Sequence, residues 1–275
     1  MVPLNKTISD LHLTSTFETP IIEVHNVSKT FHLSRKQVAI NHLKNKDKVA
    51  LNDLSFTVFK GQVYGLLGAN GAGKTTCLRI IATLLQPDQG TILVNGHDVT
   101  KDSTLVRQEI AFLTTDLKLD PFFTPSYLFD YYSALREVPL ALRNERKKQL
   151  FTRFGISEFS EVKINQLSTG MAQKASLAIA LLHDPDIIIF DEPTNGLDVL
   201  TAKLVIDYIL ELKAQGKTII ISSHIFSLIE KTCSKVGIII DGKMALEGDL
   251  KQLTTKENLE EVFFKTYLAL EDKNE

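Results

Sequence analysis

Residues 68–76 read Gly-Ala-Asn-Gly-Ala-Gly-Lys-Thr-Thr and satisfy the phosphate-loop pattern G-x-x-x-x-G-K-[ST]. The stretch follows a short apolar run at residues 63–67 and precedes a helical pattern that opens at Thr76. Glycines let the backbone curl so that successive N–H groups point at phosphate oxygens, and a helix N-terminus adds positive partial charge. The sequence therefore predicts a nucleotide phosphate site between a buried strand and a helix.

Two side chains in this loop carry the predicted chemistry. Lys74 is expected to reach the β- and γ-phosphates, and the Thr75 hydroxyl is expected to ligate Mg²⁺. The alternative is a glycine-rich turn without a ligand. The complete pattern, set between a strand and a helix, favours the phosphate site.

Composition sets the outer limits. The chain has 275 residues, of which 44% are hydrophobic, enough for a full core in one large domain or two. A net charge of −2 gives no reason to expect nucleic acid as a partner. Cys77 and Cys233 match no metal spacing and are interpreted as reduced core thiols, although the sequence leaves a disulfide open. Without a signal peptide or an apolar stretch of roughly 20 residues, we expect a soluble polypeptide.

The early part of the chain is predicted to form a small antiparallel β subdomain. Residues 22–27 and 54–58 alternate as strands do, and a further strand at residues 91–94 precedes the turn at Asn95-Gly96. Between the first two strands, residues 32–48 are basic and polar, which favours a solvated loop over a basic docking patch. Residues 1–20 lack a sustained period and are expected to be a disordered extension.

A helical subdomain is predicted for residues 125–166, after a short strand at residues 110–113. The aromatic run at its start divides into two parts. Tyr127, Leu128 and Tyr131 have helical spacings and are predicted to face the core. Phe122 and Phe123 precede Pro125 in a predicted loop, and we expect them to be exposed.

A second informative stretch is Leu-Ser-Thr-Gly-Met at residues 167–171. Ser168 can cap the following helix, and Gly170 leaves room for close approach to the backbone. Four apolar residues at i, i+3, i+4 and i+7 then predict an inward helix face: Ala175, Ala178, Ile179 and Leu182. Alone, this stretch fits an ordinary capped helix equally well.

The residues that follow decide between an ordinary capped helix and a functional motif. An apolar run at residues 187–190 predicts a buried strand that ends in Asp191-Glu192. A carboxylate there can hold Mg²⁺ through water, and Glu192 can orient or deprotonate an attacking water. A loop containing Asp198, a long helix and a strand that ends near His224 follow.

In this order, the motifs resemble the nucleotide-binding domain of ABC ATPases, over residues 21–265, with 266–275 as a C-terminal tail. Within that family the chain is most similar to subunits of bacterial ABC-2-type exporters, especially the sodium-exporter group. The phrases at residues 170–174 and 183–186 carry this narrower likeness. The resemblance implies an α/β fold: a P-loop NTPase core with a mainly parallel sheet, a small antiparallel β subdomain and a helical subdomain.

The resemblance also implies roles for individual residues. Phe31 matches the aromatic that stacks on adenine, Asp198 the residue that couples two sites, and His224 the γ-phosphate sensor. Ser168 and Gly170 match the signature that contacts ATP bound by the partner subunit. Glu192 and His224 are the expected catalytic pair, and Thr75 and Asp191 the metal pair. The expected ATP-binding residues are Phe31, Gly68, Ala69, Asn70, Gly71, Ala72, Gly73, Lys74, Thr75 and Thr76.

Two positions depart from the family pattern. Thr169 makes the signature LSTGM where LSGGQ is common, yet Ser168 and Gly170 are retained. Thr115 stands where many relatives place a glutamine that binds Mg²⁺ and reports on the membrane partner. Threonine is shorter and would reach the metal only through water.

The resemblance implies an ATP-hydrolysing exporter subunit that dimerises around two ATP, with Mg²⁺, and works with a separate transmembrane permease. It would be cytoplasmic, at the inner face of the cell membrane. The alternative is a soluble ABC ATPase acting on ribosomes or DNA. Such proteins usually carry two domains or long coiled coils, whereas only about ninety residues separate this phosphate loop from its signature. A P-loop kinase or switch is a third reading, disfavoured by the signature and by His224.

Overall fold

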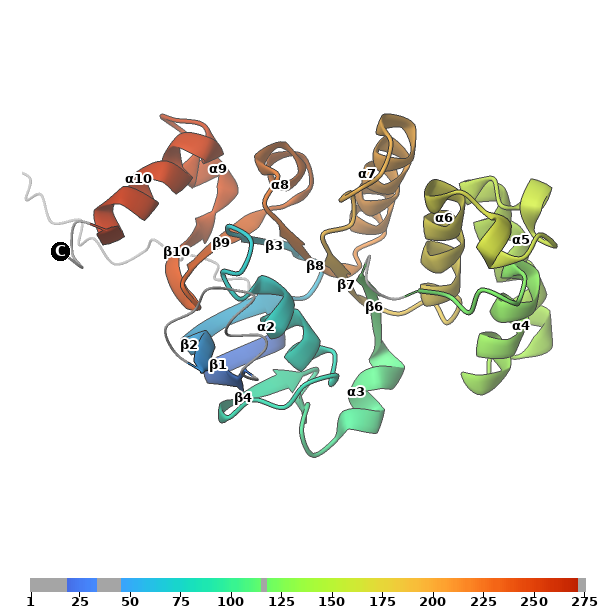
Figure 1. Ribbon diagram of the computed structural model, residues 1–275, viewed down its shortest axis with the longest axis horizontal. Helices are drawn as coiled ribbons and strands as arrows, with labels where there is room; N and C mark the ends of the chain where they lie inside the picture. Colours follow the sequence, from blue (N-terminus) through green and yellow to red (C-terminus); the bar gives the residue numbers. More distant parts are fainter. Residues whose placement is uncertain (1–18, 34–45, 115–117, 272–275) are drawn as a thin grey trace, which may run out of the picture.

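A computed structural model describes residues 19–33, 46–114 and 118–271 (Figure 1). These residues form two β-sheets and several layers of helices. The sheets meet around the phosphate loop, and one group of helices projects to the side of the larger sheet (Figure 1). Of the predicted site residues, only Thr115 lies outside the described part of the chain.

The smaller sheet is four-stranded and antiparallel throughout, in the order β2-β1-β4-β5. Its strands alternate between buried apolar and exposed positions, as expected for a sheet with one covered face. The predicted antiparallel subdomain is therefore confirmed. The strands are β1 (Pro20–His32), β2 (Asp47–Phe59), β4 (Gln89–Val94) and β5 (His97–Asp98).

The larger sheet is six-stranded, in the order β10-β9-β3-β8-β7-β6. Only the β9–β10 pair is antiparallel. Its central strands are almost wholly apolar and buried, which is typical of a parallel sheet covered on both faces. The strands are β3 (Val63–Leu67), β6 (Ile110–Thr114), β7 (Ile187–Asp191), β8 (Thr218–Ser223), β9 (Lys235–Ile240) and β10 (Lys243–Asp249).

Successive residues of the central strands enter two different cores, because side chains alternate across a sheet. In β7, Ile187 and Ile189 pack with α2 and the antiparallel sheet, whereas Ile188 and Phe190 pack with α6, α7 and α8. In Figure 1, α7 and α8 lie above the larger sheet, and α2 lies below it. The helices flanking the central sheet are α2 (Lys74–Ile81), α3 (Ser103–Glu109), α7 (Val199–Ala214) and α8 (Phe226–Thr232).

The helical subdomain packs on α6, whose predicted inward face is buried at all four positions. An edge contact between Phe129 and Phe151, with ring centroids 5.4 Å apart, joins α4 to α5. The subdomain consists of α4 (Pro125–Leu135), α5 (Leu140–Phe154) and the short 3₁₀ helices Ser157–Phe159 and Ile164–Gln166, and the helix on which it packs, α6, spans Thr169–Ala180. The chain ends with α9 (Leu250–Leu253) and α10 (Leu259–Glu271).

One face of α4 differs from the prediction. Leu128 is buried as expected, but Tyr127 is 49% and Tyr131 48% exposed, so their assignment to the core was wrong. Phe129, next to Leu128, is fully buried and shows which side of α4 packs inward. The helical spacing identified residues that share a face, but tertiary packing decided which face turned inward.

The predicted exposure of Phe122 and Phe123 is confirmed, with 71% and 40% of their surface accessible. The Phe123 ring stacks on Tyr127 at 4.6 Å between centroids, and Tyr127 stacks on Tyr131 at 6.1 Å. We call Phe122, Phe123, Tyr127 and Tyr131 the aromatic row, with Phe122 at its loop end. A solvent-facing row of stacked rings is an unusually apolar stretch of surface.

The solvated loop predicted for residues 32–48 is shorter than expected at its C-terminal end. Strand β2 already begins at Asp47, and its register pairs Lys48 with Phe31 of β1. Lys48 is therefore a strand residue. The pairing of β1 with β2 continues toward the N-terminal end of β2, beyond the alternating residues 54–58. Residues 34–45 lie outside the described part of the chain.

The predicted domain limits are only partly covered. Nearly all of residues 1–20 lie outside the described chain, and β1 begins at Pro20. The limit at residue 265 falls within α10, which continues to Glu271 without a break. Of the helices among the described residues, none combines the length and apolarity needed to span a membrane. Cys77 and Cys233 are buried free thiols, as predicted.

Candidate functional site

The phosphate loop connects the end of β3 to the start of α2, as the sequence predicts, although α2 begins at Lys74 rather than Thr76. Gly73 precedes the helix with φ +110°, a conformation that side chains disfavour. A Cβ atom at Gly73 would lie 2.4 Å from the Ala50 carbonyl oxygen. Both the backbone angle and the close approach of β2 therefore require glycine here.

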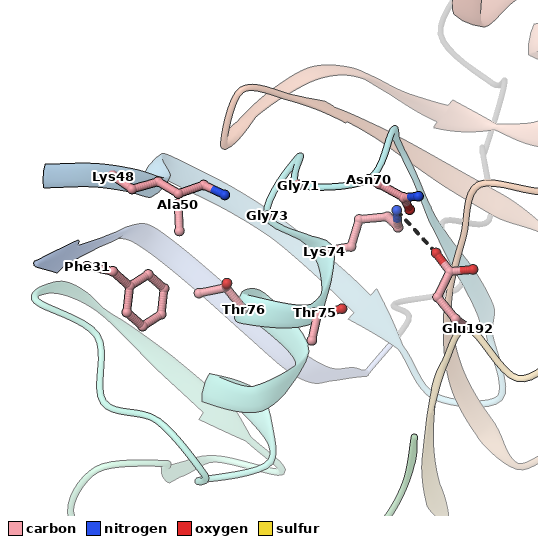
Figure 2. Close-up of a pocket in the computed structure, with 10 residues that line it drawn as sticks. All are labelled: Phe31, Lys48, Ala50, Asn70, Gly71, Gly73, Lys74, Thr75, Thr76 and Glu192. Atoms are coloured by element: carbon pink, nitrogen blue, oxygen red, sulfur yellow. Dashed lines mark ion pairs between the residues drawn. The ribbon is translucent and has the colours of Figure 1, made fainter. Parts of the chain in front are cut away.

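Lys74 is held inside this loop, and its side chain is only 5% exposed. Its ammonium donates to the carbonyl oxygens of Gly68 at 2.7 Å and Ala69 at 3.2 Å. The same Nζ lies 3.3 Å from Glu192 Oε1 (Figure 2). A buried ammonium with these acceptors is fixed in position at the floor of the loop.

Asp191 ends β7 and is 3% exposed. Its Oδ1 accepts hydrogen bonds from Thr75 Oγ1 at 3.0 Å and from Ser222 Oγ at 2.6 Å. One hydroxyl and one carboxylate in contact are oxygen donors of the kind Mg²⁺ prefers, and Mg²⁺ bound with phosphates needs only one or two carboxylates. Thr75 and Asp191 therefore fit a magnesium site.

Glu192 follows Asp191 in a left-handed conformation, with φ +51°. Its N–H lies 3.1 Å from Ser222 Oγ and 3.2 Å from the Ser222 carbonyl oxygen, which secures the turn. This turn directs the Glu192 carboxylate between Lys74 and His224, whose Nδ1 lies 3.0 Å from Glu192 Oε2. A non-glycine residue at positive φ stores backbone strain, which the hydrogen bonds to Ser222 hold in place.

These residues line or support one pocket, shown in Figure 2. We call Lys74, Thr75, Asp191, Glu192 and His224 the phosphate-loop group. Gly68, Ala69 and Ala72 belong to the loop without lining the pocket. The lining residues are Phe31, Lys48, Ala50, Asn70, Gly71, Gly73, Lys74, Thr75, Thr76 and Glu192.

Phe31 stands at the outer end of this pocket, on β1. The ammonium of Lys29 lies 5.8 Å from the Phe31 ring centroid and 2.6 Å from Asp88 Oδ1. Asp88 Oδ2 also accepts from the Thr30 N–H at 2.7 Å. The end of β1 that carries Phe31 is thus tied to the turn before β4.

Ser168, Gly170 and Asp198 form a second cluster, which with Thr201 we call the signature group. Ser168 caps α6 by accepting from the Met171 N–H at 3.2 Å, as predicted. A Cβ atom on Gly170 would lie 3.1 Å from Thr201 Oγ1 and 3.3 Å from Asp198 Oδ2. The start of α6 therefore lies directly against the start of α7.

Asp198 caps α7 through its carboxylate. Oδ1 accepts from the N–H groups of Leu200 and Thr201, each at 3.0 Å, and Oδ2 accepts from Thr201 Oγ1 at 2.7 Å. The Thr201 hydroxyl, followed by these N–H groups, lowers the pKa of Asp198. The carboxylate is also exposed, and contact with water favours its charged form as well.

The structure brings the predicted residues together in these two groups, but it does not unite the groups in one pocket. None of Ser168, Gly170 and Asp198 lines the pocket that contains Lys74. Sequence reasoning missed Lys48, Ser222 and Thr201. Strand register pairs Ser222 with Asp191, but no sequence pattern signalled the contact of Thr201 with Gly170.

Comparisons with known proteins agree with this geometry. A family model described as ABC transporter matches residues 51–195. ABC transporter ATP-binding protein NatA of Bacillus subtilis is 40% identical over 80% of this chain and 89% of its own length. Nod factor export ATP-binding protein I of Burkholderia lata is 36% identical over 74% of this chain and 66% of its own.

A solved structure, described as the ATP binding subunit of an ABC transporter, superposes with a TM-score of 0.78 at 25% identity. The match covers 90% of this chain and 99% of that one. The fold class predicted from the motifs is confirmed, and so is the resemblance to ABC ATPases. The chain therefore belongs to the ABC transporter family of ATP-binding, ATP-hydrolysing domains.

Proposed function

We propose that this chain is the ATP-hydrolysing subunit of an exporter, that it pairs with a second ATP-binding subunit, and that it drives a separate transmembrane permease. The observation that carries the pairing is the separation of the two groups. The pocket around Lys74 has no signature residue among its lining, while Ser168 and Asp198 are exposed elsewhere, with Gly170 partly exposed between α6 and α7. A second subunit would bring a signature group to each pocket.

Within each pocket, the nucleotide would extend from Phe31, which stacks on the base, to Lys74, which contacts the β- and γ-phosphates. Thr75 and Asp191 would hold Mg²⁺, which supplies charge neutralisation to the phosphate oxygens. Backbone N–H groups of the loop and the start of α2 bind the remaining oxygens. These contacts fix the phosphate chain before the reaction begins.

Glu192 is placed to act on water. Its Oε1 contacts Lys74 and its Oε2 contacts His224, so the carboxylate lies between the phosphate-binding lysine and the proposed γ-phosphate sensor. It would orient the attacking water and accept its proton as the water oxygen bonds to the γ-phosphorus and the bond from that phosphorus to the bridging β–γ oxygen breaks, which releases ADP. His224 would donate to the transferred phosphoryl group while holding Glu192 in position.

The surface around the signature group supports association with a second subunit. Val199 is 83% and Leu200 80% exposed, directly after Asp198. Two adjacent apolar side chains in water favour burial in an interface. When ATP joins the two pockets to the two signature groups, the dimer is stabilised; hydrolysis removes the bridging phosphate and lets it open.

The aromatic row supports contact with the permease at the inner face of the membrane. Phe122 and Phe123 are exposed at its loop end, and Tyr132 lines a neighbouring groove with Phe112 of β6 and Gln173 of α6. Exposed aromatic anchors beside a groove often dominate the energy of binding, at about 2 kcal/mol or more each. We therefore assign this surface to a cytoplasmic segment of the transmembrane subunit. The cargo is recognised by that subunit.

Glu192→Gln tests the ATPase and the dimer together. The amide cannot accept the proton from water, so turnover should fall about 10²–10⁴-fold while ATP binding persists. Size-exclusion chromatography should then show a dimer that forms with ATP and dissociates with ADP. Wild-type turnover in this variant would remove Glu192 from its role, and a persistent monomer would contradict the proposed pairing.

Phe122→Ala combined with Phe123→Ala tests the permease contact. Because both rings are exposed, the free subunit should fold and hydrolyse ATP normally while its association with membranes from its own cell is lost. The matched control is Phe264→Ala, which removes an exposed aromatic side chain from α10, away from the aromatic row. Unchanged membrane association, or recovery of ribosomal proteins with no integral membrane partner, would contradict this assignment.

A further inference from the structure

Lys48 lies in the wall of the nucleotide pocket, directly opposite Phe31. The antiparallel register of β1 and β2 makes the two residues a cross-strand pair, and both line the pocket. Opposed residues of such a pair project from the same face of the sheet, with Cβ atoms about 5 Å apart. Any molecule that stacks on Phe31 therefore comes within reach of the Lys48 side chain.

The ammonium of Lys48 is directed toward the phosphate loop (Figure 2). Its Nζ would lie 4.0 Å from a Cβ atom built on Gly71, in the middle of the loop. Lys48 thus spans the distance between the aromatic platform and the loop backbone, on the side of the pocket opposite Glu192 (Figure 2).

Two other lysines of the described chain that lie near this pocket are already engaged. Lys29 is paired with Asp88, and Lys74 contacts two loop carbonyls and Glu192. Lys48 has no hydrogen bond or acidic partner among the described residues, and it is exposed. A cation that faces a phosphate site without a carboxylate partner is available to an anionic ligand.

We propose that Lys48 is a second nucleotide-binding cation, which contacts the α- and β-phosphates of ATP and ADP. The position follows from its neighbours, since Phe31 holds the base end and Lys74 the β- and γ-phosphates at the far end. A side chain that starts opposite Phe31 and ends beside Gly71 meets the phosphates nearest the sugar. This inference rests on the proposed arrangement of ATP in the pocket.

The test measures binding of ATP, ADP and adenosine to the full chain by calorimetry, with Mg²⁺ chelated. Loss of one charge-assisted contact at an exposed site raises the dissociation constant about tenfold. Lys48→Gln should weaken ATP and ADP equally, by about that factor, and leave adenosine unchanged. Lys48→Arg, which keeps the charge, should restore most of the affinity.

The matched control is Lys46→Gln, which removes an exposed lysine two residues away that does not line the pocket. It should leave both nucleotides unaffected. The inference is overturned if Lys48→Gln changes no affinity, if it weakens ATP alone, or if it weakens adenosine as much as ADP. Lys74→Ala separates the two proposals: if it leaves ADP binding unchanged, the pocket itself is misassigned, whereas loss of ADP binding with an inert Lys48→Gln refutes only this inference.

Discussion

The phosphate-loop group and the signature group both include residues at the amino-terminal end of a helix, yet their surroundings differ. Lys74 and Asp191 are nearly inaccessible and are bound by side chains and carbonyls from three strand ends. Ser168 and Asp198 are exposed, and their hydrogen bonds go to the first turns of their own helices. The first group already has its internal contacts, whereas the second presents capped helix ends to an external surface. This difference predicts that substitutions in the first group affect nucleotide binding or the reaction in the chain's own pocket, and that those in the second affect only what a partner subunit completes.

The largest loss of ATP affinity is expected from Lys74→Ala. Removing the ammonium takes away a charge-assisted contact to phosphate, and ATP affinity should fall by about a hundredfold. It also leaves the Glu192 carboxylate without its cation. Calorimetric titration of the isolated chain measures the loss. Retained affinity would contradict this prediction, because the buried group would then be dispensable for ATP binding.

Gly170→Asp should spare ATP binding and lower ATP turnover. A Cβ atom at position 170 would lie 3.3 Å from Asp198 Oδ2, so the new carboxylate would be held near the Asp198 carboxylate, and like charges close together repel. We expect ATP turnover to fall by about tenfold to a hundredfold, with monomer affinity for ATP within about twofold of wild type. Equal loss of monomer binding would show that the signature group serves its own pocket. Gly170→Asp combined with Asp198→Asn tells repulsion within the chain from repulsion by a partner's phosphate.

A single chemical change, glycine to alanine, should distinguish the phosphate loop at Gly73 from the signature group at Gly170 by its effect on stability. At Gly73 the new methyl meets the Ala50 carbonyl oxygen at 2.4 Å and the backbone has φ +110°, so we expect a cost of about 2–3 kcal/mol in the free energy of unfolding. At Gly170 the closest atom is the Thr201 hydroxyl oxygen, 3.1 Å away, at the end of a side chain. The cost there should stay under about 1 kcal/mol. Urea denaturation of both variants measures the difference, and equal costs would contradict it.

The smallest effect concerns the charge of the signature group. The pKa of Asp198 is lowered first by the Thr201 hydroxyl, so Thr201→Val should raise it toward the ordinary value while the backbone N–H bonds remain. Because the lowered pKa favours the ionised cap, its contribution is present above the ordinary aspartate range and is lost in more acidic solution. Carboxyl-carbon NMR titration follows this directly. An unchanged pKa in Thr201→Val would show that the backbone N–H groups alone hold the carboxylate charged.

The order of the strands and helices that carry the phosphate-loop group could be predicted from the sequence alone. The run at residues 63–67, the glycine pattern and the apolar strand before Asp191 are local signals, because each depends on a few neighbouring residues. The fold class followed from these motifs together with their resemblance to a known family. The cap at Ser168 and the inward face of α6 were readable for the same reason.

Tertiary structure decided what depends on contacts between distant segments. The outward turn of Tyr127 and Tyr131 was set by the packing of α4 on its neighbours, since helical spacing defines a face without saying which side is covered. Lys48 entered the pocket because strand register, not sequence distance, places it opposite Phe31. Gly170 lies against Asp198 and Thr201 because α6 and α7 begin side by side. In the chain, Gly170 and Asp198 are twenty-eight residues apart. Local sequence patterns carry no information on such pairings, because the contact free energy appears only once both segments are in place.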